Sequence, residues 1–167
     1  MTDRAEIDAK LEEKFWDEIK GSPFMMLGLQ GVDNDFTRPM TAQVDNGRIY
    51  FFASRSEDLF KGLGRSSKAI ATFAGKGHKL FASIHGTLTE DTDKEVIDRL
   101  WNPIIASWYK HGKDDPDLVL LRLEAPSADV WEAHAGATLK AAALKMLFNV
   151  DPGKEHQDEH RAQVELT

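Results

Sequence analysis

The sequence contains no cysteine, and this absence excludes several kinds of chemistry at once. Without thiols the chain can form no disulfide, no thiolate metal site and no cysteine nucleophile. Such a composition suits a reducing compartment, so we expect a cytoplasmic protein. Long apolar runs are also missing and residues 1–14 are polar, which predicts a soluble protein with no membrane partner.

Positive charge is scarce as well. The chain has 21 Lys and Arg residues against 28 Asp and Glu residues, a formal net charge of −7. Non-specific binding to nucleic acid needs a basic surface that displaces counterions from the phosphates. We therefore expect no nucleic-acid partner, and an anionic ligand would need a local cluster of cations.

Linkers, repeats and low-complexity tracts are absent too, and the six prolines are scattered among patterned segments. A chain of 167 residues can bury one core of useful size. The sequence therefore predicts a single domain over residues 1–167.

Helical spacing is clearest at the amino-terminal end, where Ile7, Leu11, Phe15 and Ile19 recur every four positions. Ser54 and Glu57 fit a capping box, which predicts a short helix that starts near Arg55. The predicted helical segments are residues 5–20, 55–64, 92–108 in two pieces broken at Pro103, and 138–148 followed by a tail to 167.

Strand patterns fill most of the remaining sequence. Asp45-Asn46-Gly47 predicts a tight turn between two strands, because Asn and Gly tolerate positive φ. The expected strands are residues 24–29, 36–44, 48–53, 69–74, 79–89, 118–123 and 128–133. Six or seven mostly antiparallel strands with inserted helices predict an α+β, mainly β, barrel-like domain.

Two sets of segments resemble a known family. FTRPM at 36–40, IYFFAS at 49–54, AIATF at 69–73 and SIHGT at 83–87 resemble the FMN-binding split barrel. LWNP at 100–103, WY at 108–109, GKDDP at 112–116, LLRL at 120–123 and ADVW at 128–131 resemble its general stress protein 26 branch. By this resemblance, which runs from about Phe15 to Asp151, the chain is identified as a member of the pyridoxamine 5'-phosphate oxidase-like family.

The resemblance implies an antiparallel split β-barrel with peripheral helices, built as a homodimer with FMN in a groove between subunits. It further implies a flavin-dependent oxidoreductase linked to stress response, acting on an unknown small molecule. FAD is a possible cofactor in place of FMN. Two other functions stay open: a non-catalytic carrier or sensor for flavin or a tetrapyrrole-type ligand, and a flavin-free dimer module.

FMN needs cations for its phosphate, hydroxyls for its polyol chain and flat apolar walls for its ring. By resemblance, Arg38 and Met40 lie along the ring, Phe52 to Ser54 line the strand that leads to the phosphate, and the helix start contributes Ser56. The candidate flavin-binding residues are Arg38, Pro39, Met40, Phe52, Ala53, Ser54, Arg55, Ser56, Lys61, Lys79, Trp101 and Trp131.

The chain departs from the family pattern at Leu59, where many relatives carry a phosphate-binding lysine, and at Ala53, where many carry threonine. This departure motivates the FAD and flavin-free alternatives. No catalytic residue is nominated, although Arg38 and His85 are groups that can tune a flavin ring. Residues 156–160 match a His-x-x-Glu-His zinc pattern but lack apolar sequence around them, so we expect no metal site.

Overall fold

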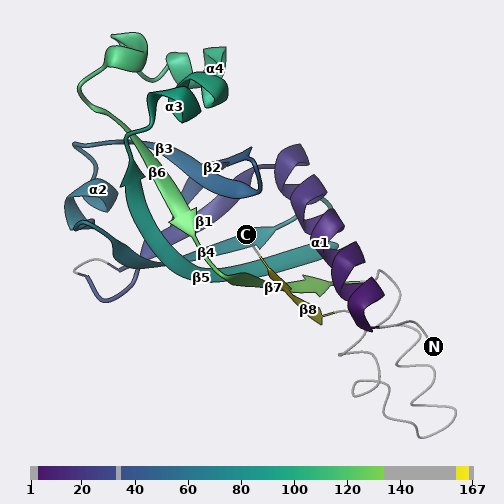
Figure 1. The fold of residues 1–167 in the computed structure, drawn as a ribbon. Coiled ribbons are helices and arrows are strands. Elements are labelled where there is room, and N and C mark those ends of the chain that lie inside the picture. Colours follow the sequence, from purple (N-terminus) through teal and green to yellow (C-terminus); the bar gives the residue numbers. More distant parts are fainter. Residues whose placement is uncertain (1–3, 33–34, 134–160, 166–167) are drawn as a thin grey trace, which may run out of the picture.

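A computed structural model describes residues 4–32, 35–133 and 161–165. Within them, eight strands form one sheet in the order β4-β1-β2-β3-β6-β5-β7-β8, and β4 also pairs with β5 (Figure 1). That extra pairing closes six strands into an antiparallel barrel, from which β7 and β8 extend. The strands are β1 (Phe24–Leu29), β2 (Arg38–Asp45), β3 (Arg48–Ser54), β4 (Ser67–Ala74), β5 (Leu80–Asp91), β6 (Leu118–Glu124), β7 (Ser127–Glu132) and β8 (Arg161–Glu165).

The barrel is split at β5, the longest strand. One edge of β5 pairs with β4, while its other edge pairs first with β7 and then, from Thr87 onward, with β6. Gly86 lies where the partner changes, and a Cβ there would stand 2.3 Å from the Glu124 carbonyl oxygen. Only glycine fits this close approach of two backbones. The predicted α+β split barrel is confirmed.

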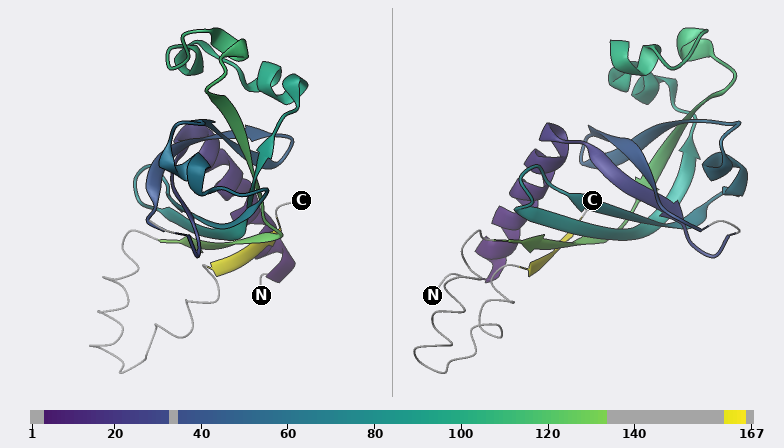
Figure 2. Two further views of the ribbon diagram at one scale, coloured as in Figure 1. Left: turned by 90° about the vertical axis from the view of Figure 1, so that its left-hand side faces the viewer. Right: turned by 180° about the vertical axis from the view of Figure 1, so that it is seen from behind.

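Helix α1 (Arg4–Gly21) covers the sheet extension and supplies part of the core (Figure 2). Its contacts are mainly with β8 and β7. Leu11, Phe15 and Ile19 are almost fully buried in the main hydrophobic cluster. The stripe of apolar residues at four-residue spacing is therefore the buried face that the sequence predicts.

The connection between β5 and β6 stands at one end of the barrel (Figure 1). It contains α3 (Lys94–Leu100), α4 (Pro103–Ala106) and a 3-10 turn, η1 (Gly112–Asp114). The Asn102 side chain accepts hydrogen bonds from the amides of Ile104 and Ile105, and Pro103 occupies the first turn of α4. The break at Pro103 is confirmed, because an Asn cap and a proline at the first turn both favour a helix start.

The expected capping box is wrong. Helix α2 (Asp58–Gly62) starts at Asp58, and Glu57 before it makes no side-chain cap. Ser54 instead ends β3 opposite Leu118, and the amide and hydroxyl of Ser56 bond to Asp117. These long-range contacts hold residues 54–57 as a turn, which shortens the helix to five residues.

Other expected boundaries shift or go untested. Strand β2 starts at Arg38 rather than at residue 36. Strand β8 was assigned to the tail, although Ala162 and Val164 alternate with polar residues there. The predicted helix at 138–148 and the zinc-like pattern at 156–160 lie outside the described residues. The single domain over 1–167 therefore stays a prediction. No helix among the described residues is long and apolar enough to cross a bilayer.

Candidate functional site

A groove of about 460 Å³ lies between the outer face of β2–β3 and α4. We call it the β2–β3 groove. Its walls are largely apolar, with Pro39, Met40 and Phe52 on the strands and Ile104 and Trp108 opposite them. Along its edge lie hydrogen-bonding side chains, namely Thr41, Gln43, Ser54, Glu57 and Asn102.

The alternation of β3 builds the floor of the groove. Phe51 belongs to the buried barrel core, whereas Phe52 faces outward and packs with the cluster of Ile105, Tyr109 and Leu118. Trp101 packs edge-on against Phe52, with 6.0 Å between the ring centroids. Trp101 thus supports the wall from behind and is not among the lining residues described.

Tyr109 ties the α4 side of the groove to the barrel. Its hydroxyl donates a hydrogen bond to the Ala53 carbonyl oxygen at 2.8 Å, and the side chain is 8% exposed. Burial raises the pKa of Tyr109 to about 12, because an ionised phenolate would lose its hydration. The neighbouring Trp108 is 79% exposed, so the groove presents an aromatic side chain directly to solvent.

A second cavity of about 370 Å³, the Arg38–Lys61 pocket, is lined by Arg38 rather than by the Pro39 that follows it. It brings Arg38 and Lys61 together beside Asp58. The Arg38 guanidinium lies over the Phe36 ring, 4.8 Å from its centroid. Its Nε is buried and has no hydrogen-bond partner among the described residues, which leaves a donor unused.

The two cavities are lined by residues that neighbour one another in the sequence. Arg38 and Asp58 line the Arg38–Lys61 pocket, whereas Pro39 and Glu57, which adjoin them in the sequence, line the β2–β3 groove. Leu59, which occupies the position of the family lysine, is fully buried in the core. Lys61 lies two residues further along α2, on a different face of this helix.

A family model described as pyridoxamine 5'-phosphate oxidase like matches residues 10–153 of the chain. The chain belongs to this family. The predicted general stress protein 26 branch is confirmed by the solved structures that resemble it, which include proteins of that name. No curated protein matches the chain.

Two Xanthomonas structures are similar to the chain at 48% sequence identity. One is a general stress family protein of X. campestris pv. campestris, with a TM-score of 0.73. The match covers 81% of this chain and 92% of that protein's chain. The general stress FMN/FAD binding protein of X. citri has a TM-score of 0.72, with 76% of this chain and 92% of its own covered. A general stress protein 26 from Jannaschia sp. CCS1 is 29% identical, with a TM-score of 0.73 and coverage of 94% and 99%.

The candidate residues separate into three groups in this family member. Pro39, Met40, Phe52, Ala53 and Ser54 line the groove, and Arg38 and Lys61 line the adjoining pocket. Arg38 and Ser54 thus do not share one cavity in a single chain. Arg55, Ser56, Lys79, Trp101 and Trp131 line neither cavity.

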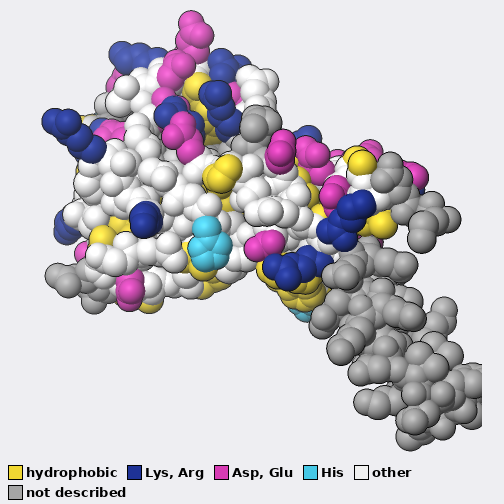
Figure 3. Space-filling view, turned by 60° about the horizontal axis from the view of Figure 1, so that its bottom comes forward, with side chains coloured by type: hydrophobic (Ala, Val, Ile, Leu, Met, Phe, Trp, Pro, Cys, Tyr) yellow, Lys and Arg dark blue, Asp and Glu magenta, His cyan; other side chains and the backbone are white. Residues whose placement is uncertain are grey.

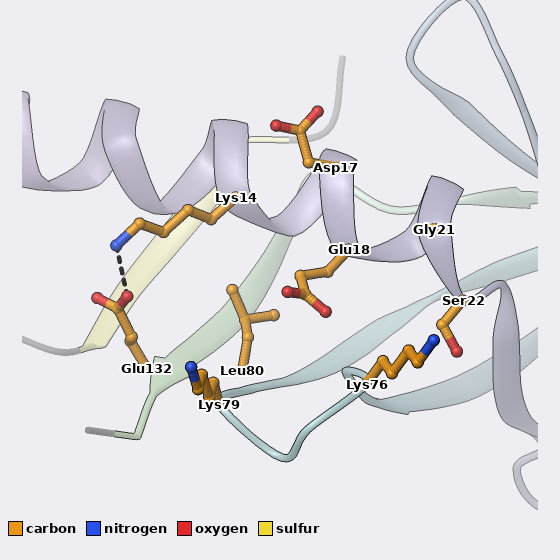
Figure 4. A pocket seen from close by; sticks show the side chains of 9 residues that line it. All are labelled: Lys14, Asp17, Glu18, Gly21, Ser22, Lys76, Lys79, Leu80 and Glu132. Atoms are coloured by element: carbon orange, nitrogen blue, oxygen red, sulfur yellow. Dashed lines mark hydrogen bonds and ion pairs between the residues drawn. The ribbon is translucent and has the colours of Figure 1, made fainter. Parts of the chain in front are cut away.

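The residues of the third group have other surroundings. Arg55 pairs with Glu90. Trp131, on β7, lies under the guanidinium of Arg161, on β8. Lys79 lines a cavity of about 530 Å³ between α1 and the β4–β5 turn (Figure 4). Three lysines and three carboxylates line that cavity, so their formal charges cancel; they are Lys14, Lys76, Lys79, Asp17, Glu18 and Glu132.

Sequence reasoning missed the α4 side of the groove. Asn102, Ile104, Trp108 and Tyr109 lie in or between the LWNP and WY segments, which carry the family resemblance but were not nominated as site residues. The available signal was the place of these residues in and between two segments that resemble the family. Among the described residues, no group of three or more His, Cys, Asp or Glu side chains forms a metal site.

We expect Tyr109→Phe to lower the free energy of unfolding by about 1 kcal/mol, the usual net value of one hydrogen bond. The raised pKa means that the phenol stabilises the fold fully below pH 10 and loses this contribution as the pH rises towards 12. Urea unfolding of both proteins across this range measures the effect. The stability difference between them should shrink from pH 10 upward, and a constant difference would contradict the assignment.

Proposed function

We propose that the chain binds FMN with the isoalloxazine ring in the β2–β3 groove and uses it as the cofactor of an oxidoreductase. The observation that carries this proposal is the groove itself, about 460 Å³ with flat apolar walls and a polar edge. Ligand sites are typically apolar clefts of about 300–1,000 Å³ with a few placed polar groups. The relative from X. citri, named an FMN/FAD binding protein, supports the same ligand class.

The residues of the site suit the three parts of FMN, which are its ring, its polyol chain and its phosphate. Pro39, Phe52 and Trp108 offer flat surfaces for the ring. Ser54 and Glu57 offer hydrogen bonds to the hydroxyls of the polyol chain. Arg38 and Lys61, at the same end of the barrel, supply positive charge for the phosphate, and Arg38 has an unused buried donor.

Bound FMN would supply the redox chemistry by accepting a hydride and passing the electrons to a second substrate. The chain's own residues bind and orient the ring and shield one side of it from water. Of the described residues that line the groove, only Glu57 and Tyr109 can ionise. The Tyr109 phenol is protonated at neutral pH, and burial raises its pKa further, to about 12. Binding and positioning are therefore the contributions that we propose for the chain.

A second copy of the chain would complete the groove. Pro39 lies beside Met26 of β1, and Met26 lies beside Thr72 of β4 on the same outer face. The row continues to Ser83 of β5 and Asp129 of β7. One outer sheet face thus runs from the groove to the strands that carry Trp131.

Apolar side chains are exposed along this face. Phe24 is 65% exposed, Met26 39%, Phe81 38% and Trp131 37%. Charged side chains are sparse over the middle of the side on which β4, β5 and β7 lie (Figure 3). Exposed apolar patches of this kind commonly mark protein interfaces. We propose that a homodimer buries this face and that Lys79 and Trp131 border the flavin of the other copy.

We expect FMN in excess to raise the melting temperature, because a ligand selective for the native state stabilises it. Trp108→Ala should weaken FMN binding about tenfold, since aromatic stacking on a base-like ring contributes about 1–3 kcal/mol. Lys113→Ala, which changes an exposed residue on the same connection, is the control. Titration followed by flavin fluorescence measures both. An unchanged melting temperature, or equal affinity in all three proteins, would contradict this site.

We expect Met26→Asp to convert the dimer to a monomer and to weaken FMN binding with it. A carboxylate on the buried face of the dimer would lose hydration without gaining a partner. Thr92→Asp places the same charge at an exposed position between β5 and α3 and should leave the dimer intact. Sedimentation equilibrium measures the mass. A wild-type protein that stays monomeric at micromolar concentration would refute the shared groove.

We expect the FMN-loaded protein to oxidise NAD(P)H steadily when an electron acceptor is present. The alternative is a carrier or sensor that holds flavin without turnover, a use that the same fold tolerates. Loss of absorbance at 340 nm separates the two, with free FMN at equal concentration as the control. A rate no greater than that of free FMN would favour the carrier.

A further inference from the structure

The turn between β3 and α2 already holds an anion, the carboxylate of Asp117. The Ser56 amide donates to Asp117 Oδ1 at 3.0 Å, and the Ser56 hydroxyl donates to Asp117 Oδ2 at 3.2 Å. One carboxylate thus occupies both donors of Ser56. The backbone reinforces this contact, because the Arg55 amide bonds to the Asp117 carbonyl oxygen at 2.9 Å.

The surroundings of this turn add further negative charge. The Arg55 side chain is paired with Glu90. Glu57 and Asp58 follow directly, at the start of a helix of only five residues. A phosphate at this turn would therefore meet the carboxylates of Asp117, Glu57 and Asp58. Like charges this close disfavour a second anion.

The Arg38–Lys61 pocket has the opposite character. It contains two cationic side chains against the single carboxylate of Asp58. Arg38 lines it, and the Nε atom of this side chain is buried without a hydrogen-bond partner among the described residues. A phosphate oxygen would satisfy this donor, and guanidinium groups bind phosphate through paired N–H donors.

We infer that Asp117 acts as an internal anion that fills the β3–α2 turn, and that the ligand's phosphate is bound by Arg38 and Lys61 instead. This inference rests on the proposed flavin binding and names which donors that binding uses. Asp117 is thereby a residue that determines where the anionic end of the ligand lies. Lys61 supplies the positive charge that Leu59, which is fully buried in the core, cannot supply.

The test compares FMN with riboflavin, which has the same ring and polyol chain but no phosphate. The measured quantity is the ratio of their dissociation constants in each variant, obtained by fluorescence titration. In the wild type we expect FMN to bind at least about tenfold more tightly than riboflavin. Arg38→Ala and Lys61→Ala should both lower the ratio, and Arg38→Ala should bring it close to one, while riboflavin affinity changes little.

Variants at the turn should behave differently. Ser56→Ala should leave the ratio unchanged, because its hydroxyl is already occupied by Asp117. Asp117→Ala should raise the ratio, because it frees the Ser56 donors and removes a repelling charge. Asp98→Ala removes the same charge from the exposed pair with Lys113, and Lys76→Ala removes a lysine at the other end of the barrel. Both controls should match the wild type.

The outcomes separate this inference from the proposed function. If Ser56→Ala lowers the ratio as far as Arg38→Ala does, the turn binds the phosphate and the inference is wrong. A lower ratio in Asp117→Ala would also contradict the inference, because Asp117 would then not repel the phosphate. Equal affinity of the wild type for FMN and riboflavin would also overturn it while leaving flavin binding intact. Failure of both ligands to bind the wild type would overturn the proposed function and this inference together. Melting temperatures and riboflavin binding show whether each variant is folded.

Discussion

The alternation of side chains along β3 is the constraint on which the rest of the structure depends. Phe51 points into the barrel and is fully buried, while Phe52 points out and forms the floor of the groove. Because a strand repeats every two residues, a shift of one position would exchange the core and the site. The α3–α4 connection covers one outer face of the barrel, where Tyr109 bonds to the β3 backbone at Ala53 and packs with Phe52.

Local patterns predicted most of the fold. The spacing of Leu11, Phe15 and Ile19 identified α1, and Asn46 and Gly47 adopt the positive φ angles that their turn requires. Each of these features depends on neighbours in the sequence. The start of α2 could not be predicted this way, because Asp117, 61 residues away, competes for the Ser56 donors. A capping pattern describes local preference only, and a tertiary hydrogen bond overrides it.

The candidate site was predicted only in part. The strand residues Pro39, Phe52 and Ser54 line the groove, as the family resemblance implied. Arg38 lies in the adjoining pocket, and no sequence period shows which of two cavities a side chain lines. Trp108 was missed as a wall because its helical spacing with Ile104 and Ile105 does not show that it is exposed rather than packed in the core. The negatively charged turn at Asp117 and the positively charged pocket at Arg38 likewise form only when strands that are distant in the sequence pair.

The central claim is that the outer face of β2–β3 binds the ring of a flavin. A crystal structure of the protein with FMN tests it most directly. The account predicts the isoalloxazine against Pro39 and Phe52, beneath Trp108, with the phosphate at Arg38 and Lys61. A ring placed instead in the cavity between α1 and the β4–β5 turn, among Lys14, Glu18 and Lys79, would contradict it.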